Sequence, residues 1–186
     1  MAAVSCELVP HEEVPTASDL FSNLPHEYSR SGAAGAFHGA SAGSGLISYA
    51  PSGLADPESF VATMAHELGH FLIRGFEEPT PGGDEAQEPA TDVCAIFLGF
   101  GVFTANAAFK FEQFQSGMTQ GWRTRRLGYL GERPLSYALA IFLALLGLDL
   151  QATASTLRGN PRGYVKNALL HLARERAEEF ARLKAT

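Results

Sequence analysis

The chain has 186 residues, of which 46% are hydrophobic and 18% are charged, and its formal net charge is −6. This length suits one domain with a buried core, and the hydrophobic fraction excludes a disordered or fibrous chain. Residues 1–93 hold 2 Lys/Arg and 14 Asp/Glu, a net charge of −12. Residues 94–186 hold 12 Lys/Arg and 6 Asp/Glu, a net charge of +6. So acidic a half argues against a nucleic-acid-binding protein.

The cysteine count and the apolar segments of the sequence bear on the cellular compartment of the protein. Cys6 and Cys94 are too few for a disulfide framework, and residues 1–30 lack the apolar core of a signal peptide. The apolar run Leu135–Leu148 is shorter than the roughly 20 residues of a membrane-spanning helix. The second run, Val93–Phe109, contains polar residues and two glycines. Both runs are interpreted as buried core helices, so we expect a cytoplasmic protein without a membrane span.

The first 45 residues are predicted to contain little regular structure. Residues 1–30 are acidic and interrupted by prolines, with at most one short helix near Ser18–Asn23. Ser31–Gly45 is rich in Gly, Ala and Ser, which favours a loop or an irregular edge. Leu46–Tyr49 follows, with β-branched and aromatic residues between Gly and Pro, and this pattern predicts one strand.

The next element has clear helix signals. Asp56, Pro57 and Glu58 supply an N-cap, a proline at the first helical position and an acid in the first turn. Apolar residues then recur at helical spacing: Phe60, Val61, Met64, Ala65, Leu68, Phe71 and Leu72. Gly75 follows, so the sequence predicts an amphipathic helix over Pro57–Arg74.

Further helices are predicted after an acidic Pro/Gly loop at Phe76–Gln87. The first starts at Pro89, because a proline deeper inside would clash with the preceding turn, and it bends at Gly99 or Gly101. The three predicted ranges are Pro89 to about Gln115, Pro134–Leu146, and Asn160 to about Lys184.

The string His66-Glu67-Leu68-Gly69-His70 lies on the first predicted helix. Residues four apart share a helix face, so the two imidazoles can bind one ion. Zinc favours such ligands, and a catalytic zinc site has three protein ligands and one open position. Glu67 lies about 100° round the helix from His66, where it can deprotonate a water whose pKa the ion lowers toward ~7. We therefore predict one Zn²⁺ ion, with Glu67 as the general base.

A third ligand must come from outside this helix. The metzincin continuation is absent, because Ile73 and Phe76 stand where Gly and His are required. Glu88 and Asp92 are four apart at the start of the next helix, so one can bind the ion and the other can orient a ligand histidine. Pro89 favours Glu88 as an N-cap, which would make Asp92 the ligand. The remaining candidates are acidic loop residues, namely Glu77, Glu78, Asp84 and Glu85.

HELGH followed by E-x-x-x-D on a second helix resembles the zincin metallopeptidases of the gluzincin type. It is also similar to compact intracellular zincins and to uncharacterised bacterial proteins with this arrangement. The resemblance covers roughly Leu46–Phe109, and it implies an α+β, predominantly helical fold with a small sheet before the metal-binding helix. It further implies metal ligands His66, His70 and Glu88, with Asp92 accepting a hydrogen bond that orients a ligand histidine.

We therefore expect one zincin-like domain over residues 1–186. It would comprise an irregular N-terminal segment (1–45), a metal-site core (46–115) and a helical C-terminal part (116–186). The expected function is zinc-dependent hydrolysis of a peptide or protein substrate. Two alternatives stay open: a zincin-fold metal-binding regulatory or interaction protein with little turnover, and a membrane-associated peptidase that uses the two apolar runs.

Substrate binding gives two further expectations. Amide hydrolysis needs a donor for the developing oxyanion, and His171 and Tyr129 are candidates by their chemistry alone. His171 lies among leucines, a pattern more typical of a packed or partly exposed histidine at the edge of the core. In zincins the strand just ahead of the metal-binding helix can pair with an extended peptide, and Leu46–Tyr49 would hold that place here.

Overall fold

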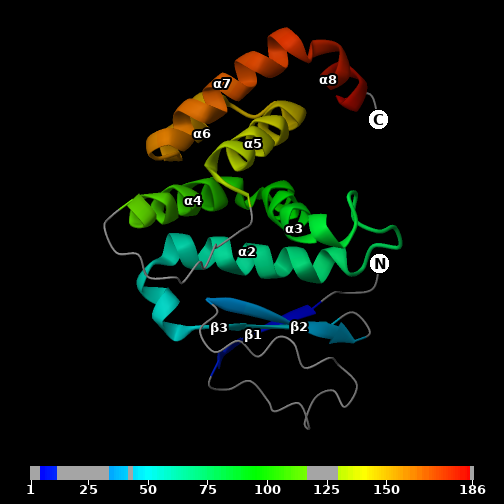
Figure 1. The fold of residues 1–186 in the computed structure, drawn as a ribbon, viewed down its shortest axis with the longest axis vertical. Coiled ribbons are helices and arrows are strands. Elements are labelled where there is room, and N and C mark those ends of the chain that lie inside the picture. Colours follow the sequence, from blue (N-terminus) through cyan, green and yellow to red (C-terminus); the bar gives the residue numbers. More distant parts are fainter. Residues whose placement is uncertain (1–4, 12–33, 42–43, 117–129, 185–186) are drawn as a thin grey trace.

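The computed structural model describes residues 5–11, 34–41, 44–116 and 130–184 (Figure 1). Three strands form one sheet: β1 (Ser5–Pro10), β2 (Gly35–Ser41) and β3 (Ser44–Tyr49). Their order is β1-β3-β2, with β3 parallel to β1 and antiparallel to β2. Strand β3 confirms the predicted strand at Leu46–Tyr49, whereas the expectation of an irregular segment before it is wrong for β1 and β2. The predicted helix near Ser18–Asn23 lies outside the described residues.

The small residues of β2 predicted a loop or an irregular edge, and the structure shows an edge strand with an irregular pairing. A Cβ atom on Gly35 would lie 2.8 Å from both Met64 Cε and Thr63 Cγ2, so only glycine lets this strand pack closely on the following helix. Gly39 has a φ of 98° at the irregularity in the pairing between Phe37 and Ala40. The glycines that suggest a loop are therefore required by packing and by a bulge.

Helix α2 (Pro57–Ile73) follows a short 3-10 turn at Pro51–Ala55 and confirms the helix predicted over Pro57–Arg74. Asp56 caps it, accepting hydrogen bonds from the Ser59 backbone N–H (3.4 Å) and the Ser59 hydroxyl (2.7 Å). One face of the helix covers the sheet, where Phe71 forms a small buried cluster with Phe37 and Ile47.

The next helical segment begins earlier than predicted. After a 3-10 turn at Asp84–Ala86 come α3 (Gln87–Ala95), a π-helical turn at Ile96–Phe100 and α4 (Gly101–Ser116). The predicted bend is confirmed at Gly99, which has a φ of 97°. By length and composition alone, Asp84–Ala108 qualifies as a membrane span, but half of its most apolar window is buried. A soluble protein's core helix meets the same criterion.

The C-terminal part consists of α5 (Glu132–Leu146), α6 (Leu150–Thr156), α7 (Gly159–Glu175) and α8 (Ala177–Lys184). Helix α5 ends as predicted at Gly147, which has a left-handed conformation with a φ of 64°. The single helix predicted from Asn160 to Lys184 is divided at Arg176, and α6 was not predicted.

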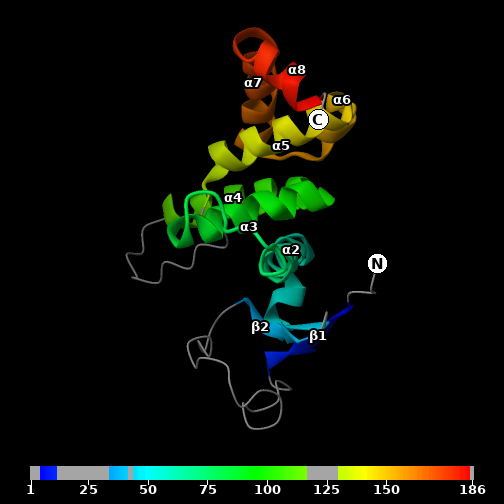
Figure 2. The same ribbon diagram turned by 90° about the vertical axis from the view of Figure 1, so that its right-hand side faces the viewer.

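The elements stack in tiers, from the sheet through α2 to α3 with α4 and then to the C-terminal helices (Figures 1 and 2). The main core lies between α4, α5 and α7, and its buried members are Ile96, Ala105, Ala108, Leu135, Leu139, Ala140, Leu143, Leu157, Val165, Ala168 and Leu172. This mostly helical fold with a small three-stranded sheet confirms the expected α+β class.

A buried polar network joins α2 to the C-terminal tier. Asn106 on α4 is 1% exposed, and its amide donates to Glu58 Oε1 (2.8 Å) and to the Thr156 carbonyl (3.0 Å). Its carbonyl accepts from the Arg158 backbone N–H (2.9 Å), and Arg158 Nη1 is 3.2 Å from Glu58 Oε2. Asn106 therefore satisfies polar groups from three segments that would otherwise lose water on folding.

We predict that Asn106→Ala lowers the free energy of unfolding by about 2–4 kcal/mol, because Glu58 and two backbone groups lose a buried partner. Asn167→Ala, on an exposed position of α7, is the control and should change stability by less than about 1 kcal/mol. Urea denaturation followed by circular dichroism measures both. Equal stability of the two variants would contradict a structural role for the network.

Candidate metal centre

Two imidazoles on α2 and a carboxylate on α3 converge on one point. The rings of His66 and His70 lie one turn apart, with centroids 4.8 Å from each other. Glu88 Oε2 is 3.1 Å from His66 Nε2 and 3.3 Å from His70 Nε2. One ligand atom from each of the three side chains lies within 4.8 Å of the others, so this group could hold a metal ion.

The start of α3 determines where the Glu88 carboxylate points. The helix begins at Gln87, and its N-cap is Ala86. Glu88 is therefore the second helical residue, and the expectation that it is the N-cap is wrong. Pro89 lies within the first turn, where backbone N–H groups have no partner in the helix, and so proline is tolerated there. The carboxylate of Glu88 extends across to α2.

Asp92 lies on the other side of the His66 ring. Its Oδ1 atom is 2.8 Å from His66 Nδ1, and its Oδ2 atom accepts the backbone N–H of Leu130 at 2.9 Å. The Asp92 side chain is only 5% exposed. An Nδ1–H donated to Asp92 leaves Nε2 of His66 as the nitrogen that faces Glu88 and His70.

Thr91 has the corresponding place beside His70, and the sequence analysis missed it. Its hydroxyl donates to the Gln87 carbonyl (2.9 Å) and lies 3.4 Å from His70 Nδ1, where its lone pair can accept the imidazole N–H. Thr91 is fully buried. Its position three residues after Glu88 puts it on the same face of α3 as Glu88, and this spacing was the available signal.

Gly69 allows α2 and α3 to approach this closely. A Cβ atom at this position would lie 2.9 Å from both the carbonyl oxygen and Cγ2 of Thr91. The backbone of α3 therefore packs directly on the α2 turn between the two histidines. The glycine of HELGH therefore has a steric role in this structure.

Glu67 points to the sheet instead of to α3. Its Oε2 atom accepts the backbone N–H of Phe37 on β2 at 2.9 Å. Burial raises the pKa of the Glu67 carboxyl, while the charges of His66 and His70 and the Phe37 hydrogen bond oppose the rise. A carboxylate with a raised pKa beside the His pair is a better proton acceptor than an ordinary exposed carboxylate.

The edge strands of the sheet are β1 and β2, and this corrects the expectation for Leu46–Tyr49. Strand β3 pairs with β1 on one side and β2 on the other, so it has no edge to offer a peptide. On β2, the Ala34 carbonyl accepts from Ala50 N–H, toward β3. Backbone groups alternate along a strand, so those of Gly35 and Phe37 point to the outer edge, where Glu67 lies.

The charged groups of the site strongly affect one another's pKa values. Burial lowers the pKa of His66, but hydrogen bonds to Asp92 and Glu88 and the charges of Asp92 and Glu67 outweigh it and raise the pKa to about 10. Burial likewise raises the pKa of Glu88, but hydrogen bonds from His66 and His70 lower it to about 2. A cation bound between these groups would take over the role of the His66 proton, because both balance the same carboxylates.

Other predicted residues lie elsewhere. His171 is exposed on α7, with its ring 5.8 Å from that of Tyr137, and α4 and α5 lie between α7 and α2 (Figures 1 and 2). The structure thus does not bring His171 to the metal centre, and Tyr129 lies outside the described residues. The four alternative acidic ligands of the loop, Glu77, Glu78, Asp84 and Glu85, are exposed and do not join the His pair.

Comparisons of the chain with models of protein families, with curated proteins and with solved structures found no match. The function has to be inferred from the residues of the site themselves.

We predict that Gly69→Ala lowers the free energy of unfolding by about 1–3 kcal/mol, because its Cβ would push α3 away from α2. Replacing a glycine inside a helix by alanine normally raises the free energy of unfolding by about 0.5–1 kcal/mol. At Gly69 we expect the opposite effect. Gly163→Ala on α7 is the matched control, since its Cβ meets no atom within 4 Å, and it should show the normal stabilisation. Thermal unfolding of the two variants measures the difference, and a stabilised Gly69→Ala protein would contradict the close contact.

Proposed function

We propose that the protein is a zinc-dependent peptidase whose metal ligands are His66, His70 and Glu88. The observation that carries the proposal is the convergence of two imidazole Nε2 atoms and one carboxylate oxygen, with an acceptor from α3 beside each Nδ1 atom. Asp92 and Thr91 are these acceptors. They would orient the rings and keep Nε2 free for an ion.

The donor set and its exposure fit a catalytic zinc ion. Two imidazoles and one carboxylate are a known ligand set of catalytic zinc, whereas structural zinc sites are closed by four ligands. Within the ranges that the structure describes, the group has three protein ligands and no fourth. The side chains of His66, His70 and Glu88 are 14%, 15% and 27% exposed, so one side of the group is open to solvent and to a substrate.

Glu67 would perform the proton transfers. Zinc held by these ligands would supply acidification of water and polarisation of the scissile carbonyl. Glu67 would accept a proton as the water oxygen bonds to the carbonyl carbon, and would pass it to the departing amine nitrogen as the C–N bond breaks. The hydrogen bond from Phe37 N–H holds one carboxylate oxygen, and the other oxygen is available for this proton.

The outer edge of β2 would hold the substrate. An extended peptide can add to an exposed strand edge through main-chain hydrogen bonds. Backbone groups of Gly35 and Phe37 point to that edge, and Glu67 lies beside it. The scissile bond of a peptide bound there would pass close to Glu67 and to the His pair.

We predict that the purified protein binds one zinc ion and that Glu88→Ala abolishes this stoichiometric binding. Asp92→Ala should retain the ion with an affinity about 10–100-fold weaker, because it removes only the partner of His66 Nδ1. Glu85→Ala changes an exposed carboxylate three residues away and should bind zinc like the unmodified protein. Metal analysis with a competing chelator measures all three. Zinc retained by Glu88→Ala and lost by Asp92→Ala would reverse the two roles.

We predict that zinc-loaded protein cleaves members of a peptide library and that Glu67→Gln lowers kcat/KM at least about 100-fold, because the general base is lost. The zinc content of the variant should not change, since Glu67 is not a ligand. Product formation is followed by mass spectrometry. Cleavage that survives Glu67→Gln would rule out this mechanism, and full zinc binding without cleavage would favour a regulatory metal-binding protein.

A further inference from the structure

Arg74 extends the functional face of α2 beyond the metal ligands. It follows the last residue of the helix, seven positions after Glu67, which is close to two full turns on the same side. Its guanidinium carbon lies 5.2 Å from the centroid of the Phe37 ring. The backbone N–H of Phe37 in turn donates to Glu67. Glu67 and Arg74 therefore meet the same residue of the edge strand β2.

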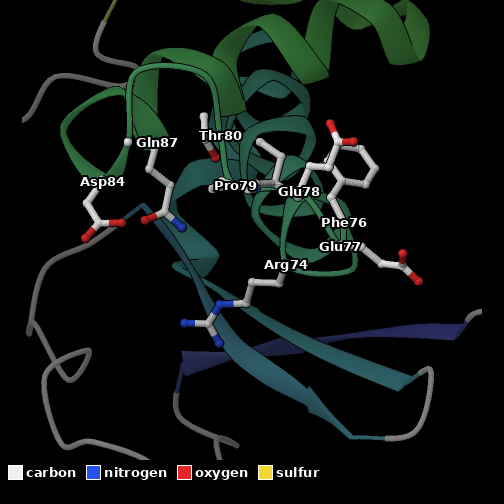
Figure 3. A pocket seen from close by; sticks show the side chains of 10 residues that line it. Arg74, Phe76, Glu77, Glu78, Pro79, Thr80, Asp84 and Gln87 are labelled. Atoms are coloured by element: carbon white, nitrogen blue, oxygen red, sulfur yellow. The ribbon is translucent and has the colours of Figure 1, made fainter.

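Arg74 also lines an open hollow at the C-terminal end of α2, together with Glu77, Glu78 and Asp84 of the following loop. Ile73 and Gln87 line the same hollow, and they lie close in sequence to His70 and Glu88, respectively. Figure 3 shows the guanidinium reaching from the end of α2 toward the strands. A group bound to Arg74 would thus lie on the path of a peptide that follows β2 past Glu67.

The charge of Arg74 has no ionic partner among the residues that the structure describes. It is one of only two Lys/Arg in the acidic half of the chain, which carries 14 Asp/Glu. Its side chain is exposed, and its described contact is the face of the Phe37 ring. In Figure 3 the carboxylates of Glu77 and Glu78 project away from it. A guanidinium held in this way presents a planar set of donors that matches a carboxylate.

The spacing sets where that carboxylate would be in the substrate. Two turns of α-helix rise about 10 Å, and an extended peptide advances about 3.3 Å per residue. We infer that Arg74 binds a carboxylate of the substrate about three residues from the cleaved bond. The carboxylate is either an Asp or Glu side chain or the C-terminal carboxylate. The position relative to a cleaved bond rests on the proposed peptidase function. The binding of a carboxylate by Arg74 does not depend on turnover.

Glu77, Glu78 and Asp84 line the same hollow, but among the described residues none of these exposed carboxylates forms an ion pair with Arg74. Water and salt weaken their repulsion of a bound carboxylate, because all three are exposed. A carboxylate in contact with Arg74 would form short charge-assisted hydrogen bonds, which are about twice as strong as neutral ones. The acidic surroundings would instead disfavour a second anionic group on the same peptide, so the site selects peptides with one carboxylate at this spacing.

The test uses eight-residue alanine-based peptides that carry one Glu at each position in turn, with Gln peptides as neutral partners and with free or amidated C termini. Mass spectrometry locates the bond cut by the zinc-loaded protein. We expect cleavage two to four residues from the Glu, with kcat/KM about tenfold above that of the Gln partner. A preference for the free C terminus alone would identify the terminal carboxylate as the ligand. Arg74→Gln should remove the preference, and Arg74→Glu should transfer it to Lys peptides.

Arg133→Gln is the matched control, because the Arg133 guanidinium also lies over a ring, that of Tyr164 at 5.3 Å, but on the C-terminal helices. It should leave the Glu preference unchanged. Cleavage at positions that ignore the Glu, with the same pattern in Arg74→Gln, would overturn the inference and leave the peptidase function standing.

A binding measurement separates the two proposals. The same peptides with a fluorescein label are titrated with zinc-loaded Glu67→Gln protein, and anisotropy gives Kd. We expect about tenfold tighter binding of the preferred carboxylate peptide than of its neutral partner, and loss of this difference on adding Arg74→Gln. That result without any turnover by the unmodified protein would support the binding site and contradict the peptidase. Equal Kd values for Glu and Gln peptides and for both C termini would overturn the role of Arg74.

Discussion

The contact between the backbones of α2 and α3 is the constraint on which the site depends. Gly69 lies against Thr91 so closely that a Cβ would be 2.9 Å from its carbonyl oxygen. Only at this separation can the short side chains of α3 reach across to both imidazoles. Glu88 then meets the Nε2 atoms, while Thr91 and Asp92 meet the Nδ1 atoms. One glycine thus lets a single turn of helix supply both the carboxylate beside the Nε2 atoms and the acceptors beside the Nδ1 atoms of the two histidines.

The C-terminal helices contribute to the site through Asp92. A buried carboxylate is costly unless its oxygens are hydrogen-bonded, and Asp92 has one partner on α2 and another at Leu130, just before α5. Helix α5 packs on α4 and α7 in the main core. The position of the carboxylate beside His66 is therefore fixed from both sides, by the helix that carries the histidines and by the tier that closes over α3.

Local signals predicted the parts of the fold that depend on neighbours in sequence. The cap at Asp56, the HELGH spacing, the bend at Gly99 and the stop at Gly147 all follow from such signals. Strand β2 could not be predicted, because Gly35 reflects packing against Thr63 and Met64, which are distant in sequence. The choice between Glu88 and Asp92 could not be made for a similar reason: a start of α3 two residues earlier turns Glu88 from a cap into a side chain that faces α2.

Helix α2 separates two tasks between adjacent residues. His66 and Glu67 are neighbours in sequence, but a helix turns about 100° per residue, so their side chains leave in different directions. His66 points to α3 and its carboxylates, whereas Glu67 points to the N–H of Phe37 on the edge strand. The cluster of His66, His70 and Glu88 and the strand edge are thus on two sides of one helix, and Glu67 lies between them. Gly35 of β2 completes this arrangement, because a larger side chain there would contact Glu67 Cγ and hold the strand away from the Glu67 carboxylate.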